Sequence, residues 1–296
     1  MEAESDDVLK SFEVVRPWRF WWDWLWTVVP VFGLIYLCEQ VSFLFYIPAV
    51  YLIGSRIFRL ALLGHEGVHG LLFRSSKWNT FVARYLCHFP VMISFSRYRA
   101  IHLLHHRFVG EGQDPDGYIY QGYPICFRTW LKRTLVGILI GRALLNFFEY
   151  FTEVPVHVRK LFGRPEGRQL LVKSDFSQYL IFWCVVLLTI IYFEAWYYFA
   201  LYYLVPAYLL MPFNELSNAY QHGAYSGKAQ SRSQTLPYGL MEFIFPLHLN
   251  FHFEHHLNSR VPHYNLPVYS RALKARNRLP QENVGSFTAA TRLIFR

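Results

Sequence analysis

Residues 40–69 read QVSFLFYIPAVYLIGSRIFRLALLGHEGVH, an apolar stretch that ends in a pair of histidines. Before this pair the only charged residues are Arg56 and Arg59. A helix of about 20 mostly apolar residues crosses the hydrocarbon core of a bilayer. If the helix continues to residue 69, His65 and His69 lie one turn apart on the same face. The stretch therefore predicts a membrane helix that ends in metal-ligating side chains.

The composition of the whole chain agrees with a membrane protein. Of its 296 residues, 53% are hydrophobic, 19% aromatic and only 17% charged. Soluble domains carry about 25% charged residues. These figures exclude disordered and collagen-like chains, and the four cysteines form no CxxC pair that would indicate a thiolate metal site.

Outward from residues 40–69, three more uncharged runs have the length of a membrane span. Glu39 separates the first two runs and Glu194 separates the last two, which predicts two hairpins. The expected spans are approximately residues 20–38, 40–63, 176–193 and 195–214. The run 134–141 is too short to span and is expected to form an interfacial amphipathic helix. The predicted fold is thus an all-α integral membrane protein with four transmembrane helices.

The distribution of charge orients these spans. Residues 64–177 hold 15 Lys and Arg against 8 Asp and Glu, and residues 223–296 hold 9 against 3. Because basic loops stay on the cytoplasmic side, both segments and both termini are expected there. We expect a multi-pass protein of the bacterial inner membrane or endoplasmic reticulum, with a helical cytoplasmic cap formed by residues 64–175 and 215–296.

Eight of the 13 histidines fall into three short motifs on the expected cytoplasmic side. The motifs are HEGVH at 65–69, HLLHH at 102–106 and HFEHH at 252–256. Imidazole suits zinc, copper, iron and nickel, and one tetrahedral zinc takes at most four ligands. Eight imidazoles therefore favour two metal ions that share one cage. The expected ligands are His65, His69, His102, His105, His106, His252, His255 and His256.

An alternative reading starts from HExxH at residues 65–69, which is the zinc-protease signature with a glutamate as general base. An intramembrane zinc protease would leave both HxxHH motifs without a role. A metal-binding membrane protein without catalysis, such as a transporter, is a further alternative. The isolated His88, His157 and His263 are expected to be structural or exposed.

Three longer strings carry a resemblance to a known family. They are GHEGVHGLLFR at 64–74, YRAIHLLHHRF at 98–108 followed by QDPD at 113–116, and NFHFEHHLNSRVPHYNLP at 250–267. This pattern resembles the membrane fatty acid desaturase/hydroxylase family, and bacterial-type acyl desaturases in particular. The resemblance implies a single desaturase-like domain over residues 1–296 and O₂-dependent desaturation of a fatty acyl chain at a di-iron centre. Hydroxylation or ketolation of a lipid or carotenoid is the alternative within the same family.

The resemblance also implies further site residues. His222, in the string NAYQH, is expected as a ninth imidazole ligand, and Asn218, one helical turn earlier, as a group that reaches the metal through water. His248, Glu66 and Glu254 are expected to support the ligands or to reach the metal through water. No catalytic residue is expected beyond the metal centre itself.

The expected reaction consumes electrons, and the sequence contains no motif that carries them. It has no GxGxxG, no thiolate cluster motif and no HPGG stretch of a fused cytochrome b5. An external donor of the ferredoxin or cytochrome b5 type is therefore expected. The remaining partners are the lipid or acyl substrate and the membrane, and no nucleic-acid module accompanies the basic residues.

Overall fold

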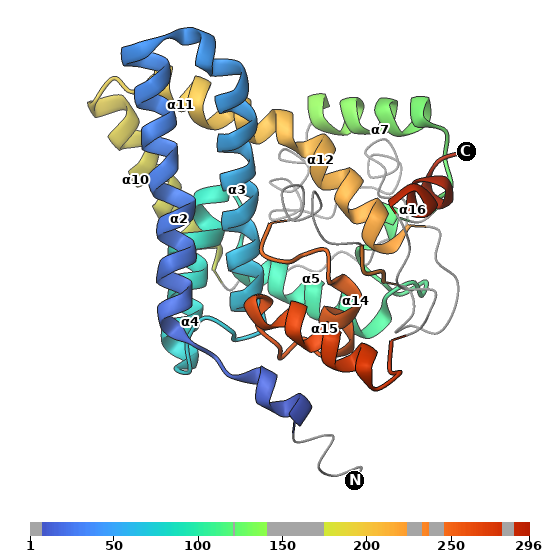
Figure 1. The fold of residues 1–296 in the computed structure, drawn as a ribbon. Helices are drawn as coiled ribbons and strands as arrows, with labels where there is room; N and C mark the ends of the chain where they lie inside the picture. The colour runs from blue at the N-terminus through green and yellow to red at the C-terminus, as the bar shows by residue number, and fades with distance from the viewer. Residues whose placement is uncertain (1–7, 121, 141–174, 224–232, 237–245, 280–286) are drawn as a thin grey trace. The chain divides into compact units, whose positions relative to one another are not determined.

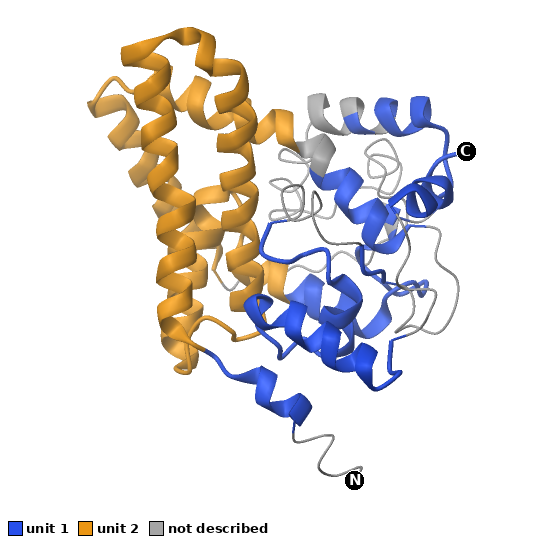
Figure 2. Ribbon diagram, in the orientation of Figure 1, with its two compact units in different colours: residues 1–15, 100–171, 213–296 blue, residues 16–99, 172–212 orange. Residues whose placement is uncertain are grey.

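The computed structural model describes residues 8–120, 122–140, 175–223, 233–236, 246–279 and 287–296. Apart from two isolated bridges, Ile125–Phe295 and Thr235–Phe251, the regular structure of these residues is helical, as the sequence predicts. The chain divides into two compact units (Figure 2). We call residues 16–99 and 172–212 the hairpin unit, and residues 1–15, 100–171 and 213–296 the histidine unit.

The hairpin unit is built around two long antiparallel helices that lie side by side (Figure 1). α2 (Pro17–Tyr36) continues in a π-helical turn (Leu37–Val41), and α3 (Tyr46–Val68) follows a short 3₁₀ turn (Phe43–Phe45). Pro17 favours the first turn of α2 because this position needs no backbone N–H donor. The segments Pro17–Val41 and Phe43–Val68 are both long and apolar enough to cross a membrane. The first contains the expected span 20–38, and the second covers the expected span 40–63 from residue 43 onward.

The first hairpin turns at Ser42, three residues after the predicted position at Glu39. Ser42 is extended, with φ −165° and ψ 134°, and its hydroxyl accepts the Leu44 N–H at 3.2 Å. Glu39 remains inside the helical turn because the hydroxyl of Tyr202 donates to its carboxylate. This long-range contact keeps the glutamate from ending the helix.

The second hairpin turns at Glu194, as predicted, with a left-handed φ of 53°. Before it lies α10 (Phe176–Tyr192), a predominantly apolar helix of 17 residues. After it, α11 (Trp196–Phe199), a π-helical turn (Ala200–Leu204) and α12 (Val205–His222) follow without interruption. In the described part of the chain, two helices rather than four are long and apolar enough to span.

The remaining helices of the hairpin unit hold the end of α3. α4 (Ser76–Val82) carries Asn79, whose side-chain amide donates to the Gly67 carbonyl at 2.7 Å and accepts the Leu72 N–H at 3.0 Å. A π-helical turn (Ala83–His88) and a 3₁₀ turn (Phe89–Val91) lead into α5 (Phe95–Phe108). Asn79 thus binds backbone groups on both sides of the α3 terminus, next to His65 and His69.

The histidine unit consists of shorter helices. They are the histidine-bearing part of α5, α6 (Gly117–Tyr120), α7 (Phe127–Ile140), the end of α12, α14 (His252–Leu257), α15 (Leu266–Ala275) and α16 (Phe287–Ile294). The expected interfacial helix at 134–141 corresponds to the second half of α7, which starts seven residues earlier; residue 141 lies outside the described residues.

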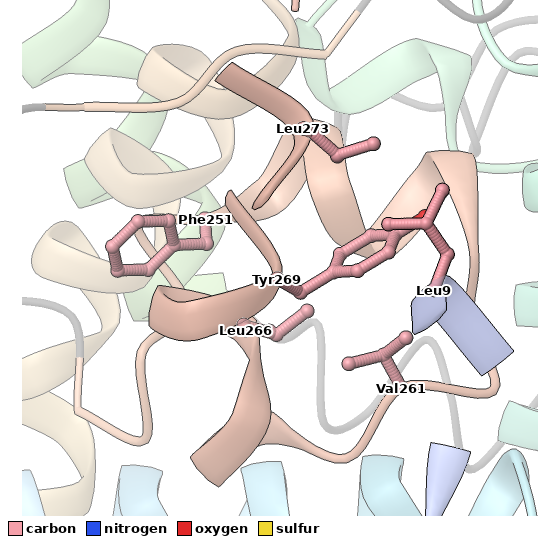
Figure 3. Packing of buried hydrophobic residues seen from close by; sticks show 6 residues of the cluster. All are labelled: Leu9, Phe251, Val261, Leu266, Tyr269 and Leu273. Atoms are coloured by element: carbon pink, nitrogen blue, oxygen red, sulfur yellow. The ribbon is translucent and has the colours of Figure 1, made fainter. Parts of the chain in front are cut away.

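Two apolar clusters support the histidine-bearing helices. The first cluster joins the N-terminal segment to the region of α14 and α15 through Leu9, Phe251, Val261, Leu266, Tyr269 and Leu273 (Figure 3). The second cluster joins α12 to α16 through Ala219, Tyr220, Leu236, Ala290 and Ile294. Each cluster packs next to a helix that presents imidazoles.

Candidate metal centre

α5 and α14 each present three imidazoles from one HxxHH motif. On α5, His102 and His106 are one turn apart and their Nε2 atoms lie 2.9 Å from each other. On α14, His252 and His256 have the same spacing, with 3.1 Å between their Nε2 atoms. The helical repeat therefore brings residues i and i+4 of each motif to one point, as the spacing predicts.

Four of the histidines form the first group, which we call the quartet. Its members are His105, His222, His252 and His256. The Nε2 atom of His222 lies 3.2 Å from that of His105 and 2.8 Å from that of His252. The last residue of α12 is thereby brought together with α5 and α14, although the site role of His222 was implied only by the family resemblance.

The second group in this unit, which we call the triplet, consists of His102, His106 and His255. The Nε2 atoms of His255 and His106 are 3.1 Å apart. His255 and His102 are buried, at 3% and 6% exposure. The two groups divide the six histidines of the HxxHH motifs three and three, and His222 makes the quartet the larger group.

This donor set fits metal ions. With metal–nitrogen distances of about 2.0–2.1 Å, two imidazole nitrogens on one ion lie roughly 2.8–3.4 Å apart. The observed Nε2–Nε2 distances run from 2.8 to 3.2 Å. Nitrogen lone pairs that face each other at this distance need a proton or a cation between them. The arrangement therefore suits two metal positions.

The environment of His256 keeps its imidazole neutral, which is the form that binds metals. Burial lowers the pKa of His256 well below its usual value, and the neighbouring His106, His252, His222 and His105 lower it further. A neutral ring in the middle of the quartet is ready to act as a ligand.

Asp114 is a site residue for which the sequence analysis gave no role. Its carboxylate oxygens lie 3.0 and 3.1 Å from Nδ1 of His105, and the hydroxyl of Tyr120 donates to the same carboxylate. Burial lowers the pKa of His105, but the hydrogen bond and the charge of Asp114 outweigh it, so the pKa is raised overall. The signal in the sequence was QDPD, which follows the second histidine motif within a few residues.

Glu254 is completely buried, and two hydroxyl groups hold its carboxylate. It accepts hydrogen bonds from the hydroxyls of Thr235 and Ser270 and so ties α14 to α15. Burial raises the pKa of Glu254, and the two hydroxyl hydrogen bonds lower it in part. Among the described residues it supports the helix that carries the ligands and does not hydrogen bond to a ligand.

His65 and His69 lie in the hairpin unit, at the end of α3. Their ring centroids are 5.0 Å apart, as expected for residues one turn apart. Glu66, which lies between the two histidines in the sequence, is buried in the structure. Its Oε1 lies 3.9 Å from Nδ1 of His65.

The remaining expected site residues are not members of the quartet or the triplet. Asn218 is half-buried on α12, one turn before His222. His248 belongs to neither histidine group; its φ of 56° places it in the turn before α14, and its ring centroid lies 6.1 Å from that of His263. His88 and His263 are buried, and His157 lies outside the described residues.

Comparison with known proteins agrees with the histidine pattern. Residues 41–287 match the model of the fatty acid desaturase family. A curated relative, the sn-1 acyl-lipid omega-3 desaturase (ferredoxin) of Nostoc sp. (strain 36), is 24% identical over 272 residues, which cover 82% of this chain and 72% of the relative. The match includes all nine expected imidazole ligands and favours an oxidoreductase over a zinc protease. The chain belongs to the fatty acid desaturase family, whose members are oxidoreductases.

Proposed function

We propose that this protein is an O₂-dependent desaturase of fatty acyl chains that uses a di-iron centre. The observation that carries the proposal is the gathering of seven buried or half-buried imidazoles into a quartet and a triplet with metal-compatible Nε2–Nε2 distances. Within the desaturase family, this donor set is suited to two iron ions.

His65 and His69 are proposed to supply two further ligands. Their one-turn spacing at the end of α3 and the family match across this segment support the assignment. Asn218 is proposed to act through a water molecule from its position one turn before His222. With His65 and His69 added to the quartet and the triplet, the centre has nine imidazole ligands.

When bound, the iron pair supplies the oxidising power to break unactivated C–H bonds with O₂, which acid–base side chains cannot provide. The overall reaction removes two hydrogens from adjacent carbons of the acyl chain, and two electrons from the external donor together with two protons complete the reduction of O₂ to two water molecules. The chain's own contribution is a set of neutral imidazoles and a buried setting that excludes bulk water. The protein also positions the acyl chain, because small shifts separate desaturation from oxygen insertion.

We further propose that the protein crosses the membrane four times, with both termini and the metal centre on the cytoplasmic side, as a single domain. α2 and α3 have the length and composition of spans. The 17-residue apolar α10 and the helical run from Trp196 onward are the proposed third and fourth spans. The basic segments 64–177 and 223–296 support the cytoplasmic placement.

An external ferredoxin is the proposed electron donor. The name of the Nostoc relative includes ferredoxin, and a basic cytoplasmic surface would attract an acidic carrier. Electron-transfer rates measured against ionic strength test the steering. The rate is expected to fall as salt rises, and a rate independent of salt contradicts electrostatic steering.

The proposal is tested by counting metal in purified protein. Wild-type protein loaded with iron is expected to hold two Fe per chain, and His256→Ala and His105→Ala are expected to lose iron and activity while still inserting into membranes. One Zn per chain without iron supports the protease instead. Full activity in either variant contradicts the ligand assignment.

A further inference from the structure

We propose that Asp114 and Tyr120 form a positioning pair that orients His105 toward the metal of the quartet and does not bond to the triplet. The inference rests on the proposed metal centre and deepens it. It assigns roles to two residues outside the histidine motifs.

The geometry between His105 and Asp114 fixes which ring nitrogen faces the quartet. Nδ1 of His105 lies 3.0 Å from Oδ2 and 3.1 Å from Oδ1 of Asp114. A carboxylate only accepts, so Nδ1 carries the proton and donates it. Nε2, on the far side of the ring, is then left with its lone pair directed toward Nε2 of His222, 3.2 Å away. A carboxylate on the second nitrogen both orients a metal-bound imidazole and raises its basicity.

Asp114 is itself held by groups other than the histidine. Its Oδ1 accepts the Asp116 N–H at 2.9 Å. Its Oδ2 accepts the Gly110 N–H at 3.3 Å and the hydroxyl of Tyr120. Gly110, with φ +72°, adopts the left-handed conformation that favours glycine, and this turn directs its N–H inward. The carboxylate is therefore fixed before any metal binds.

The Asp114 carboxylate is a buried charge next to His105. The side chain is fully buried, and its ion-pair partner in the described residues is His105. Burial of a carboxylate without a compensating positive charge is costly. A metal ion bound at Nε2 of His105 would supply that charge through the ring.

Tyr120 links this pair to a second ligand. Its hydroxyl donates to Asp114 and accepts the Gly110 N–H at 2.7 Å. Its ring centroid lies 5.1 Å from that of His222 and 6.3 Å from that of His105. Tyr120 is 6% exposed and so packs firmly against two members of the quartet.

The prediction is selective because Asp114 bonds to His105 and to no member of the triplet within the described residues. The loss of Asp114 should therefore weaken one of the two metal positions. A general loss of structure would weaken both.

The test is an anaerobic Fe(II) titration of the full-length protein in detergent, combined with Mössbauer spectra of ⁵⁷Fe-loaded samples. Asp114→Asn keeps the shape of the side chain and removes its charge. We expect it to weaken one of the two irons by roughly 10- to 100-fold, the range for partners of metal-bound histidines, and to leave the other unchanged. In the spectrum, one iron signal should shift and the other should stay.

Tyr120→Phe is the second variant, since it leaves Asp114 in place and removes the hydroxyl that donates to its carboxylate and accepts the Gly110 N–H. It should shift the same iron signal with a smaller loss of affinity. Tyr264→Phe is the matched control. Its hydroxyl donates to the Val14 carbonyl at 3.0 Å in the same unit, and its ring lies next to His263, which belongs to neither histidine group, so it should leave both irons unchanged.

Unaltered affinity and spectrum in Asp114→Asn overturn the inference, and so does an equal loss of both irons. A wild-type protein that binds no iron contradicts the proposed function itself, and with it this inference. Two irons in the wild type with no selective change in the variants leave the proposed function standing and remove only the positioning pair.

Discussion

Gly64 stands directly before His65, and the ring of His88 fills the place where its side chain would be. A Cβ at Gly64 would lie 1.9 Å from Cδ2 and 2.2 Å from Nε2 of His88. His88 is fully buried, and its Nε2 lies 3.2 Å from the Ala61 carbonyl, one turn before His65. Burial lowers the pKa of His88 to about 3, and the hydrogen bond to Ala61 offsets this in part, so the ring is neutral and donates to that carbonyl.

Gly64→Ala is therefore expected to force His88 out of place and to lower the free energy of unfolding by about 1–3 kcal/mol, the usual cost of overpacking. Gly33→Ala is the matched control, because a Cβ there meets nothing within 4 Å. In a helix this change should raise the free energy of unfolding by up to about 1 kcal/mol. The unfolding midpoints of both purified proteins in detergent give the comparison; equal midpoints contradict the packing argument.

Among single residues, the contacts that follow from a repeated histidine spacing could be predicted from the sequence, and the contacts that depend on a turn could not. The HxxHH spacing predicted that imidazoles meet, and the structure brings seven of them together in one unit. The contact between His105 and Asp114 depends on the turn at Gly110, and this turn was not predicted. His248, which was expected to support the ligands, lies in a turn before α14, and α14 begins only at His252.

Among the elements, α16 is a support for the helix that ends in His222. It buries Ala290 and Ile294 completely against Ala219 and Tyr220 of α12. The Tyr220 and Thr291 hydroxyls also lie 2.8 Å apart. Tyr220 precedes His222 by two residues, so the packing of α16 fixes the end of α12 at the quartet.

Ile294→Ala should lower the free energy of unfolding by about 2–5 kcal/mol, because it leaves a cavity in this cluster. The neighbouring Leu293 is 44% exposed, and Leu293→Ala should change stability by no more than about 0.5 kcal/mol. Chemical denaturation followed by circular dichroism measures both. Similar losses in the two variants would show that α16 is not packed as described.

The hairpin of α2 and α3 contains a nearly buried ion pair. Arg59 donates to Asp23 at 2.6 Å and to the Thr27 hydroxyl at 3.1 Å. Asp23→Leu removes the carboxylate that contacts the Arg59 charge and should lower the free energy of unfolding by about 3–5 kcal/mol. The double variant Asp23→Leu/Arg59→Leu should recover most of this loss. If the double variant is as unstable as the single one, the arginine charge that remains in Asp23→Leu is not the cause of the lost stability.

Helix types and approximate lengths could be predicted from hydropathy, because apolar runs decide them locally. The exact turn at Ser42 could not, since the Tyr202 hydroxyl that keeps Glu39 helical is more than 160 residues away in sequence. The same limit explains α12: the fourth predicted span ends at Asn214, but the helix continues to His222 because Ala219 and Tyr220 are buried.

For the whole molecule, composition, charge and the histidine motifs together predicted the family, and the match over residues 41–287 confirms it. The prediction succeeded because the sequence contains three histidine motifs with helical spacing and apolar runs between them. The division into two compact units was not expected from the sequence, since the units interleave along the chain.

The central claim is that this protein removes two hydrogens from a fatty acyl chain at a histidine-held di-iron centre. The most direct measurement is lipid mass spectrometry of a host without its own acyl desaturase that expresses the protein with a ferredoxin and its reductase. Wild type and Tyr264→Phe are expected to produce acyl chains lighter by two hydrogens, and His256→Ala to produce none. An unchanged lipid profile, or chains that have gained an oxygen atom and kept their single bonds, would contradict the account.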